Sequence, residues 1–193
     1  MYIFCEWESI QDEYKNFQLA LQKGENKMIQ KCNAEWAPKT FGYLTPSEGQ
    51  YGRTTILPEL LDDWNATQMA HWRQQFTTAG HQLIIAGAGA GNTLPEDLKV
   101  LWTGLAFPNK QMNISEVKWY IGDRKYGRLD LEEIHSYNKP AIVFQEPFII
   151  DEETAFELYG YVEEPDFQRI VMLGATYYKY IDKVLGNCGA AIA

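Results

Sequence analysis

Large apolar side chains recur along the first 23 residues at alternating steps of four and three positions. This spacing keeps one side of an α-helix apolar, so it predicts an amphipathic helix over residues 2–23 that ends at Gly24. Since large apolar groups are costly to leave in water, this seam must contact either the protein's own core or another subunit, and the sequence leaves both open. The residues of the seam are Ile3, Trp7, Ile10, Tyr14, Phe17 and Leu21.

Three later segments also show helical spacing. A central helix is predicted over residues 58–79. A short helix is predicted over residues 94–102, where Thr93 and Glu96 have the spacing of a capping box. The longest is predicted over residues 165–185, whose apolar positions form one broad helical face.

Strand patterns concentrate in the second half of the chain. Two alternating segments around Gly122-Asp123 predict a β-hairpin. Pro147 interrupts an extended apolar stretch, which indicates an edge strand, a bulge or two separate strands. Residues 130–137 are expected to form one or two helical turns. The predicted strands are 83–86, 117–121, 125–129, 141–145, 148–150 and 155–162.

These elements together predict an α+β fold. A mostly antiparallel sheet over residues 117–162 would be flanked by the N-terminal amphipathic helix, the central helix and the long C-terminal helix. The length of 193 residues indicates a single domain over residues 1–193. An N-terminal helical or extended arm, residues 1–56, and a short apolar tail, residues 186–193, would extend from it.

Aromatic residues punctuate the segment 32–56, which also contains prolines and glycines. A disordered linker would not carry so many aromatic side chains, so we expect an ordered loop or an arm that wraps a neighbour. The apolar C-terminal tail gives a similar indication, because chain ends are usually polar unless they are tied down. With the seam, these segments supply the other candidate interface residues: Trp36, Phe41, Tyr43, Tyr51 and Ile192.

The formal net charge of −9 argues against direct binding to nucleic acid, since the 17 lysines and arginines form no basic run. No membrane contact is expected, because no apolar run approaches the ~20 residues that cross a bilayer. The three cysteines, Cys5, Cys32 and Cys188, lack a CxxC spacing and suit a reducing compartment. The acidic N-terminus does not resemble a signal peptide, so we expect an intracellular, cytoplasmic protein.

One glycine-rich stretch, Gly87–Thr93, lies between a predicted strand and a predicted helix, where backbone amides can cradle a phosphate. Its details depart from the known fingerprints, because Asn92 stands where a dinucleotide loop needs glycine and no lysine precedes Thr93. The three histidines have no partners at metal-ligand spacing. No catalytic residue, cofactor or metal is therefore assigned.

These observations favour a non-enzymatic structural protein that assembles with itself or with other assembly proteins, such as a capsid, neck or tail component of a virion. One alternative is an acidic inhibitor or immunity-type module that masks a basic protein. It would be supported if Asp151–Glu153 formed one patch with the acids at 163, 164 and 166. A second alternative is a small enzyme that binds a phosphorylated ligand at the loop Gly87–Thr93.

Overall fold

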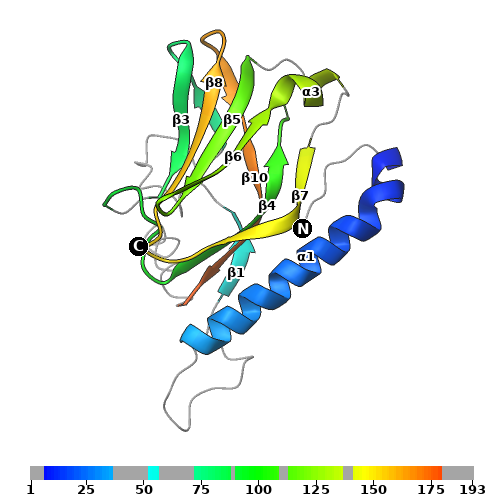
Figure 1. The fold of residues 1–193 in the computed structure, drawn as a ribbon, viewed down its shortest axis with the longest axis vertical. Helices are drawn as coiled ribbons and strands as arrows, with labels where there is room; N and C mark the ends of the chain where they lie inside the picture. The colour runs from blue at the N-terminus through cyan, green and yellow to red at the C-terminus, as the bar shows by residue number, and fades with distance from the viewer. Residues whose placement is uncertain are drawn as a thin grey trace, which may run out of the picture.

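Two four-stranded antiparallel sheets pack face to face, and one long helix covers the outer face of one of them (Figure 1). The computed structural model describes residues 7–36, 52–56, 72–87, 90–108, 113–136 and 141–179. The helices are α1 (Trp7–Trp36) and α3 (Leu131–Ser136). The strands are β1 (Gly52–Thr55), β2 (Arg73–Gln75), β3 (Gly80–Ala86), β4 (Leu98–Ala106), β5 (Ile114–Ile121), β6 (Arg124–Asp130), β7 (Ala141–Ile150), β8 (Phe156–Val162), β9 (Phe167–Arg169) and β10 (Val171–Tyr178).

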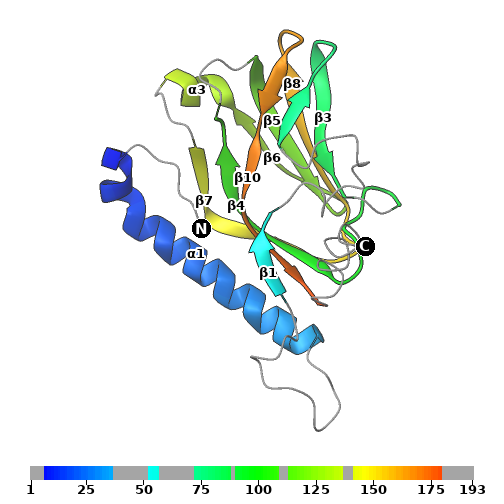
Figure 2. The ribbon, with the colours of Figure 1, turned by 180° about the vertical axis from the view of Figure 1, so that it is seen from behind.

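Sheet 1 has the strand order β1-β10-β4-β7, and sheet 2 has the order β3-β8-β5-β6. A separate two-stranded sheet pairs β2 with β9. All of these pairings are antiparallel. Sheet 1 and α1 lie on one side of the molecule and sheet 2 on the other, as both views show (Figure 1, Figure 2).

The core between the two sheets is built around Trp102 of β4, which is fully buried. Its ring makes edge-on contacts with Trp119 of β5 at 5.2 Å and with Phe156 of β8 at 5.6 Å, so it joins sheet 1 to sheet 2. Phe144 lies edge-on at 5.0 Å. The indole nitrogen Nε1 donates to the carbonyl oxygen of Gly104 at 2.7 Å, so the buried polar atom is satisfied.

A second, smaller hydrophobic cluster lies on the opposite face of sheet 1, beneath α1. Side chains of the helix at steps of four pack there against β4, β7 and β10. Because β4 is covered by sheet 2 on one face and by α1 on the other, all nine of its residues are buried. The buried members of this cluster are Met28, Cys32 and Trp36 from the helix, and Leu101, Ala175 and Tyr177 from the sheet.

The expected α+β fold is wrong: the described chain is mostly β, with its strands in antiparallel sheets. Within the predicted C-terminal helix, residues 167–169 and 171–178 form the strands β9 and β10, and residues 180–185 lie outside the described part. A bulge between Leu173 and Gly174 shifts the register of β10 against β4. This shift breaks the alternation of a regular strand, which explains why the apolar spacing resembled that of a helix.

Two other helix predictions are also wrong. Most of the predicted helix 94–102 belongs to β4, whose continuous apolar run reflects burial on both faces. Within the predicted helix 58–79, residues 73–75 form β2, whereas residues 57–71 lie outside the described part.

Gly24 does not end the first helix, because α1 continues to Trp36. A Cβ atom at position 24 would lie 3.0 Å from Cγ of Pro147 and 3.1 Å from Cδ1 of Leu101. The glycine therefore lets the helix backbone approach sheet 1 closely. Its role is packing within the helix rather than termination.

Several local predictions are confirmed. The buried strand 83–86 lies in β3, the hairpin around Gly122-Asp123 is β5–β6, and α3 occupies most of residues 130–137. The alternating segment 155–162 contains β8. Pro147 lies in β7, which is an edge strand of sheet 1. The register of β7 jumps opposite residues 102–104 of β4, so Pro147 also belongs to a bulge.

No helix in the described part of the chain is both long enough and apolar enough to cross a membrane.

Replacing Trp102 with alanine should lower the free energy of unfolding by about 3–5 kcal/mol, since it removes the ring that joins the two sheets. Urea denaturation followed by far-UV circular dichroism measures this loss. The control is Leu83→Ala, whose side chain is 39% exposed and should cost less than about 1 kcal/mol. Equal losses for the two variants would contradict the assignment of Trp102 to the centre of the core.

Candidate functional site: the docking surface of α1

The contact between α1 and sheet 1 brings together apolar and charged groups from distant parts of the chain. Two of the predicted interface residues, Leu21 and Trp36, are buried within the chain itself, at 4% and 5% exposure. Four others occupy the earlier turns of the same helix: Trp7, Ile10, Tyr14 and Phe17. The remaining predicted residues lie outside the described part: Ile3, Phe41, Tyr43, Tyr51 and Ile192.

The most unusual group in this contact is Lys99, which lies in β4 and is only 1% exposed. Its ammonium nitrogen Nζ lies 2.6 Å from Oε2 of Glu35 on α1. It also lies 3.3 Å from Oδ1 of Asp151 and 3.3 Å from Oε1 of Glu152, both in the turn after β7. The ring of Trp36 approaches the same nitrogen to 5.0 Å. A buried lysine therefore has one counter-charge from the helix and two from the sheet side.

The same three carboxylates form further bonds with Lys31 and Trp36 on α1 and with the backbone beside β4. Lys31 of α1 forms an ion pair with Asp151, and its Nζ lies 4.0 Å from Oε1 of Glu35. The indole of Trp36 donates to Oε1 of Glu152 at 3.1 Å, and the backbone N–H of Asp97 donates to Oε2 of Glu152 at 2.9 Å. We call Lys31, Glu35, Trp36, Lys99, Asp151 and Glu152 the Lys99 cluster.

The electrostatics of the Lys99 cluster favour the charged forms of Lys99 and Glu152. Burial by itself lowers the pKa of Lys99, but the hydrogen bond to Glu35 and the nearby carboxylates outweigh it, so the pKa is raised above its usual value. Burial raises the pKa of Glu152, but the bonds from Trp36 and Asp97 and the charge of Lys99 outweigh it, so the pKa is lowered. A buried ion pair stabilises the docked helix only while all of its partners are charged and present, because removing one partner leaves an uncompensated buried charge.

Cys32 lies in the apolar part of the same contact and is fully buried. Burial raises the pKa of its thiol to about 11, although the charge of Lys99 acts in the opposite direction. The thiolate is the reactive form of cysteine, so Cys32 is unreactive while α1 is docked on sheet 1.

A second polar contact holds the middle of α1. Glu25 forms an ion pair with Arg53 on β1, and the hydroxyl group of Tyr177 on β10 also interacts with Arg53. Closer to the edge strand, Nζ of Lys23 lies 3.6 Å from Oε1 of Glu146, but both side chains are largely exposed. Exposed pairs of this kind contribute little to stability.

The loop Gly87–Thr93 does not precede a helix, because it leads into β4 by way of Leu94, so the proposed phosphate cradle lacks a helix N-terminus. Backbone amides at both ends of the loop are used within the fold. Gly87 N donates to Phe156 O at 3.0 Å, and Leu94 N donates to Thr154 O at 2.9 Å. The predicted capping box is wrong, since Oγ1 of Thr93 donates to the carbonyl oxygen of Ala90 at 3.2 Å.

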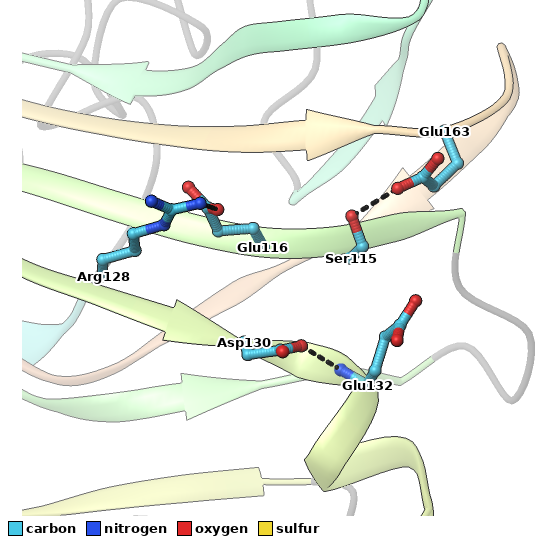
Figure 3. A pocket seen from close by; sticks show the side chains of 6 residues that line it. All are labelled: Ser115, Glu116, Arg128, Asp130, Glu132 and Glu163. Atoms are coloured by element: carbon cyan, nitrogen blue, oxygen red, sulfur yellow. Dashed lines mark hydrogen bonds and ion pairs between the residues drawn. The ribbon is translucent and has the colours of Figure 1, made fainter.

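A shallow depression of about 520 Å³ is lined by residues of β5 and β6 and by neighbouring residues that follow β6 and β8 (Figure 3). Its charged groups are largely paired with one another. Arg128 forms an ion pair with Glu116, and the hydroxyl group of Ser115 donates to Glu163 at 2.6 Å. Asp130 accepts the backbone N–H of Glu132 at 2.9 Å, as a helix cap does at the start of α3. The acidic residues that line the depression therefore have structural roles in pairing and in capping α3.

The acidic residues on which the inhibitor hypothesis depends do not form one patch. Asp151 and Glu152 precede β8 and belong to the Lys99 cluster, whereas Glu163 follows β8. The length of β8 separates these two groups by about 20 Å. Among the described residues, no group of three or more His, Cys, Asp and Glu side chains has the geometry of a metal site.

No family model, curated protein or solved structure matches this chain. The functional argument therefore depends on the geometry described above.

Sequence reasoning missed the Lys99 cluster. The available signal was a lysine inside the apolar run 98–106, where a charge has to be paired or moved to the surface. Its partners Glu35, Asp151 and Glu152 are 52 or more positions away, so no local spacing revealed them.

The glycine loop should show a packing role rather than a ligand role when it is substituted. Gly87→Ala should lower the unfolding free energy by more than about 2 kcal/mol, because its Cβ would lie 2.3 Å from the backbone of Thr93. The matched control is Gly91→Ala, which has open space and carries only the cost of a positive φ of 71°, about 1–2 kcal/mol. Chemical denaturation compares them, and a smaller loss for Gly87→Ala would contradict this role.

Proposed function

We propose that this protein is a non-enzymatic assembly subunit whose copies associate through α1. The observation that carries the proposal is that the apolar seam of α1 begins well before the residues of α1 that are described as packed on sheet 1. The seam begins at Trp7, the first residue of α1. Among the side chains that the structure describes, the buried contacts of α1 occupy Leu21 to Trp36.

The earlier seam positions follow the same helical phase as the docked ones. Positions 7, 10, 14 and 17 continue in steps of three and four to Leu21, Gly24 and Met28. Residues at these spacings share one face of a helix. The first turns of α1 lie beyond the edge strand β7 in both views (Figure 1, Figure 2).

The magnitudes are sufficient for association. Burying a large apolar side chain contributes about 1.5–3 kcal/mol, and two copies would contribute four such residues each. The loss of translational and rotational freedom on association costs about 4–15 kcal/mol. The seam of residues 7–17 can therefore support a homo-oligomer without a large additional interface.

Within assembly proteins, we propose a capsid, neck or tail component of a virion as the class to test. A small antiparallel sandwich supplies a rigid body, and a long helix at its edge supplies a contact element. This combination would let each subunit keep its shape while it binds its neighbours. Electron microscopy of the purified chain would reveal rings, tubes or shells.

Ile10→Glu should dissociate the proposed oligomer, because it places a charge within the seam in every copy. We expect the dissociation constant to rise at least about tenfold and the mass to approach 22.2 kDa on dilution. Size-exclusion chromatography with light scattering measures the mass. The matched control is Gln11→Glu, which adds the same side chain one position off the seam. A parent chain that stays at 22.2 kDa at high concentration would refute the proposal, as would equal behaviour of the two variants.

A further inference from the structure

We propose that α1 is a releasable cover over sheet 1 and that the Lys99 cluster is the latch that holds it. Acid would open this latch and free the helix while the sandwich stays folded. This inference does not depend on association between copies, since it concerns contacts within one chain.

The core between the two sheets contains no described residue of α1, so its packing does not need the helix. The buried side chains of this core come from the strands and from the segments that connect them. The contacts of α1 belong to a separate cluster on the other face of sheet 1. Removing the helix would expose Leu101, Ile149 and Tyr177 but would leave the contacts of Trp102 with sheet 2 in place. Such separate clusters permit local opening below the free energy of global unfolding.

The charges at the latch come from every element packed around Lys99. Glu35 reaches Lys99 from α1, whereas Asp151 and Glu152 reach it from the turn between β7 and β8. Asp97 lies next to this group and pairs with Lys179 at 3.3 Å. The titratable and charged groups at the latch are Lys31, Cys32 and Glu35 on α1, Asp97 and Lys99 on or beside β4, Asp151 and Glu152 in the turn, Tyr177 on β10 opposite Lys99, and Lys179 after β10.

Acid weakens this latch by removing its negative charges. When the carboxyl groups are protonated, Lys99 keeps its charge at 1% exposure and loses the charges that compensate it. Lys31 on the helix then adds a like charge nearby. Moving the helix away hydrates both ammonium groups, so protonation favours the undocked state.

The pH window follows from the signs of two shifts. The docked pKa of Glu152 is lower than the ordinary value of 4.5, so its contribution to docking is present above pH 4.5 and is lost as the pH falls through the lowered pKa. The docked pKa of Lys99 is higher than its ordinary value of 10.5, so its contribution is fully present below pH 10.5 and is lost as the pH rises through the raised value. Docking is therefore strongest between these limits, and release is expected on the acid side.

Cys32 is a natural reporter of release, because it lies on the face of α1 that packs on sheet 1 and is fully buried there. In a Cys5→Ser, Cys188→Ser chain it is the one remaining thiol. Labelling by 4,4′-dithiodipyridine is measured from pH 7 to about pH 3 and divided by the rate for the same chain in urea at each pH. Near-UV circular dichroism of the core tryptophans, Trp102 and Trp119, follows the sandwich in parallel, after the contribution of Trp36 on α1 is subtracted by comparison with a Trp36→Phe chain. Protection of Cys32 should fall at least about tenfold below pH 4.5 while the near-UV signal persists.

Two variants separate the latch from general acid sensitivity. Glu35→Gln combined with Glu152→Gln imitates protonation and should raise labelling at pH 7 at least about tenfold. Lys99→Met replaces the buried cation with an apolar chain of similar length and should abolish the release by acid, because no buried cation loses its counter-charges when the carboxyl groups are protonated. The matched control is Lys23→Met with Glu146→Gln, which breaks an exposed ion pair between α1 and β7. This control should change neither the labelling of Cys32 at pH 7 nor its pH dependence.

Three results would overturn the proposal. One is loss of Cys32 protection and of the near-UV signal at the same pH, which means that the chain unfolds as one unit. Another is unchanged protection down to about pH 3. The third is a Glu35→Gln, Glu152→Gln variant that is as protected at pH 7 as the control. If Lys99→Met fails to fold, the glutamine variant and the parent chain decide the question.

Discussion

The burial of β4 on both faces is the constraint on which the rest of this structure depends. One face meets sheet 2 through Trp102, and the other face meets α1 through Leu101. An antiparallel sandwich usually leaves its outer faces to solvent. Here the outer face of sheet 1 is apolar, so a helix is needed to cover it. Gly24 makes close approach possible by removing the side chain that would meet Pro147 and Leu101.

A charged lysine in this doubly buried strand costs free energy unless it is paired, and its pairing fixes the position of the groups around it. Lys99 occupies the face of β4 that α1 covers, and it is stabilised there only if carboxylates arrive from elsewhere. Glu35 brings one on the helix, and the turn after β7 brings two more. Apolar packing alone would tolerate several positions of a helix on a sheet, whereas these bonds select one register. The same bonds make the docking of α1 dependent on charge.

Where one face of a strand is buried and the other is exposed, the alternation of apolar and polar residues was enough to predict the strand. The segment 155–162 alternates because Phe156 and Leu158 are buried while Glu157 and Tyr159 lie on the opposite, partly exposed face, and the β5–β6 hairpin has a clear turn at Gly122. Where both faces are buried, as in β4, a continuous apolar run carries no period and was assigned to a helix. In β10, the bulge between Leu173 and Gly174 interrupts the alternation of buried and exposed positions, so this segment also resembled a helix.

The candidate site was less accessible to sequence reasoning than the fold. The apolar seam of α1 was visible in the sequence, and two candidate residues of this helix, Leu21 and Trp36, are buried within the chain. The Lys99 cluster depends on pairs more than 50 positions apart, so only the tertiary structure assembles it.

Hydrogen–deuterium exchange of the intact chain at neutral pH tests most directly whether α1 is a separate layer on a complete sandwich. The amides of residues 21–36 should exchange through an opening that leaves β5 and β8 protected, so two levels of protection are expected. A single level, with the helix and both sheets exchanging together, would contradict the separation of the two hydrophobic clusters.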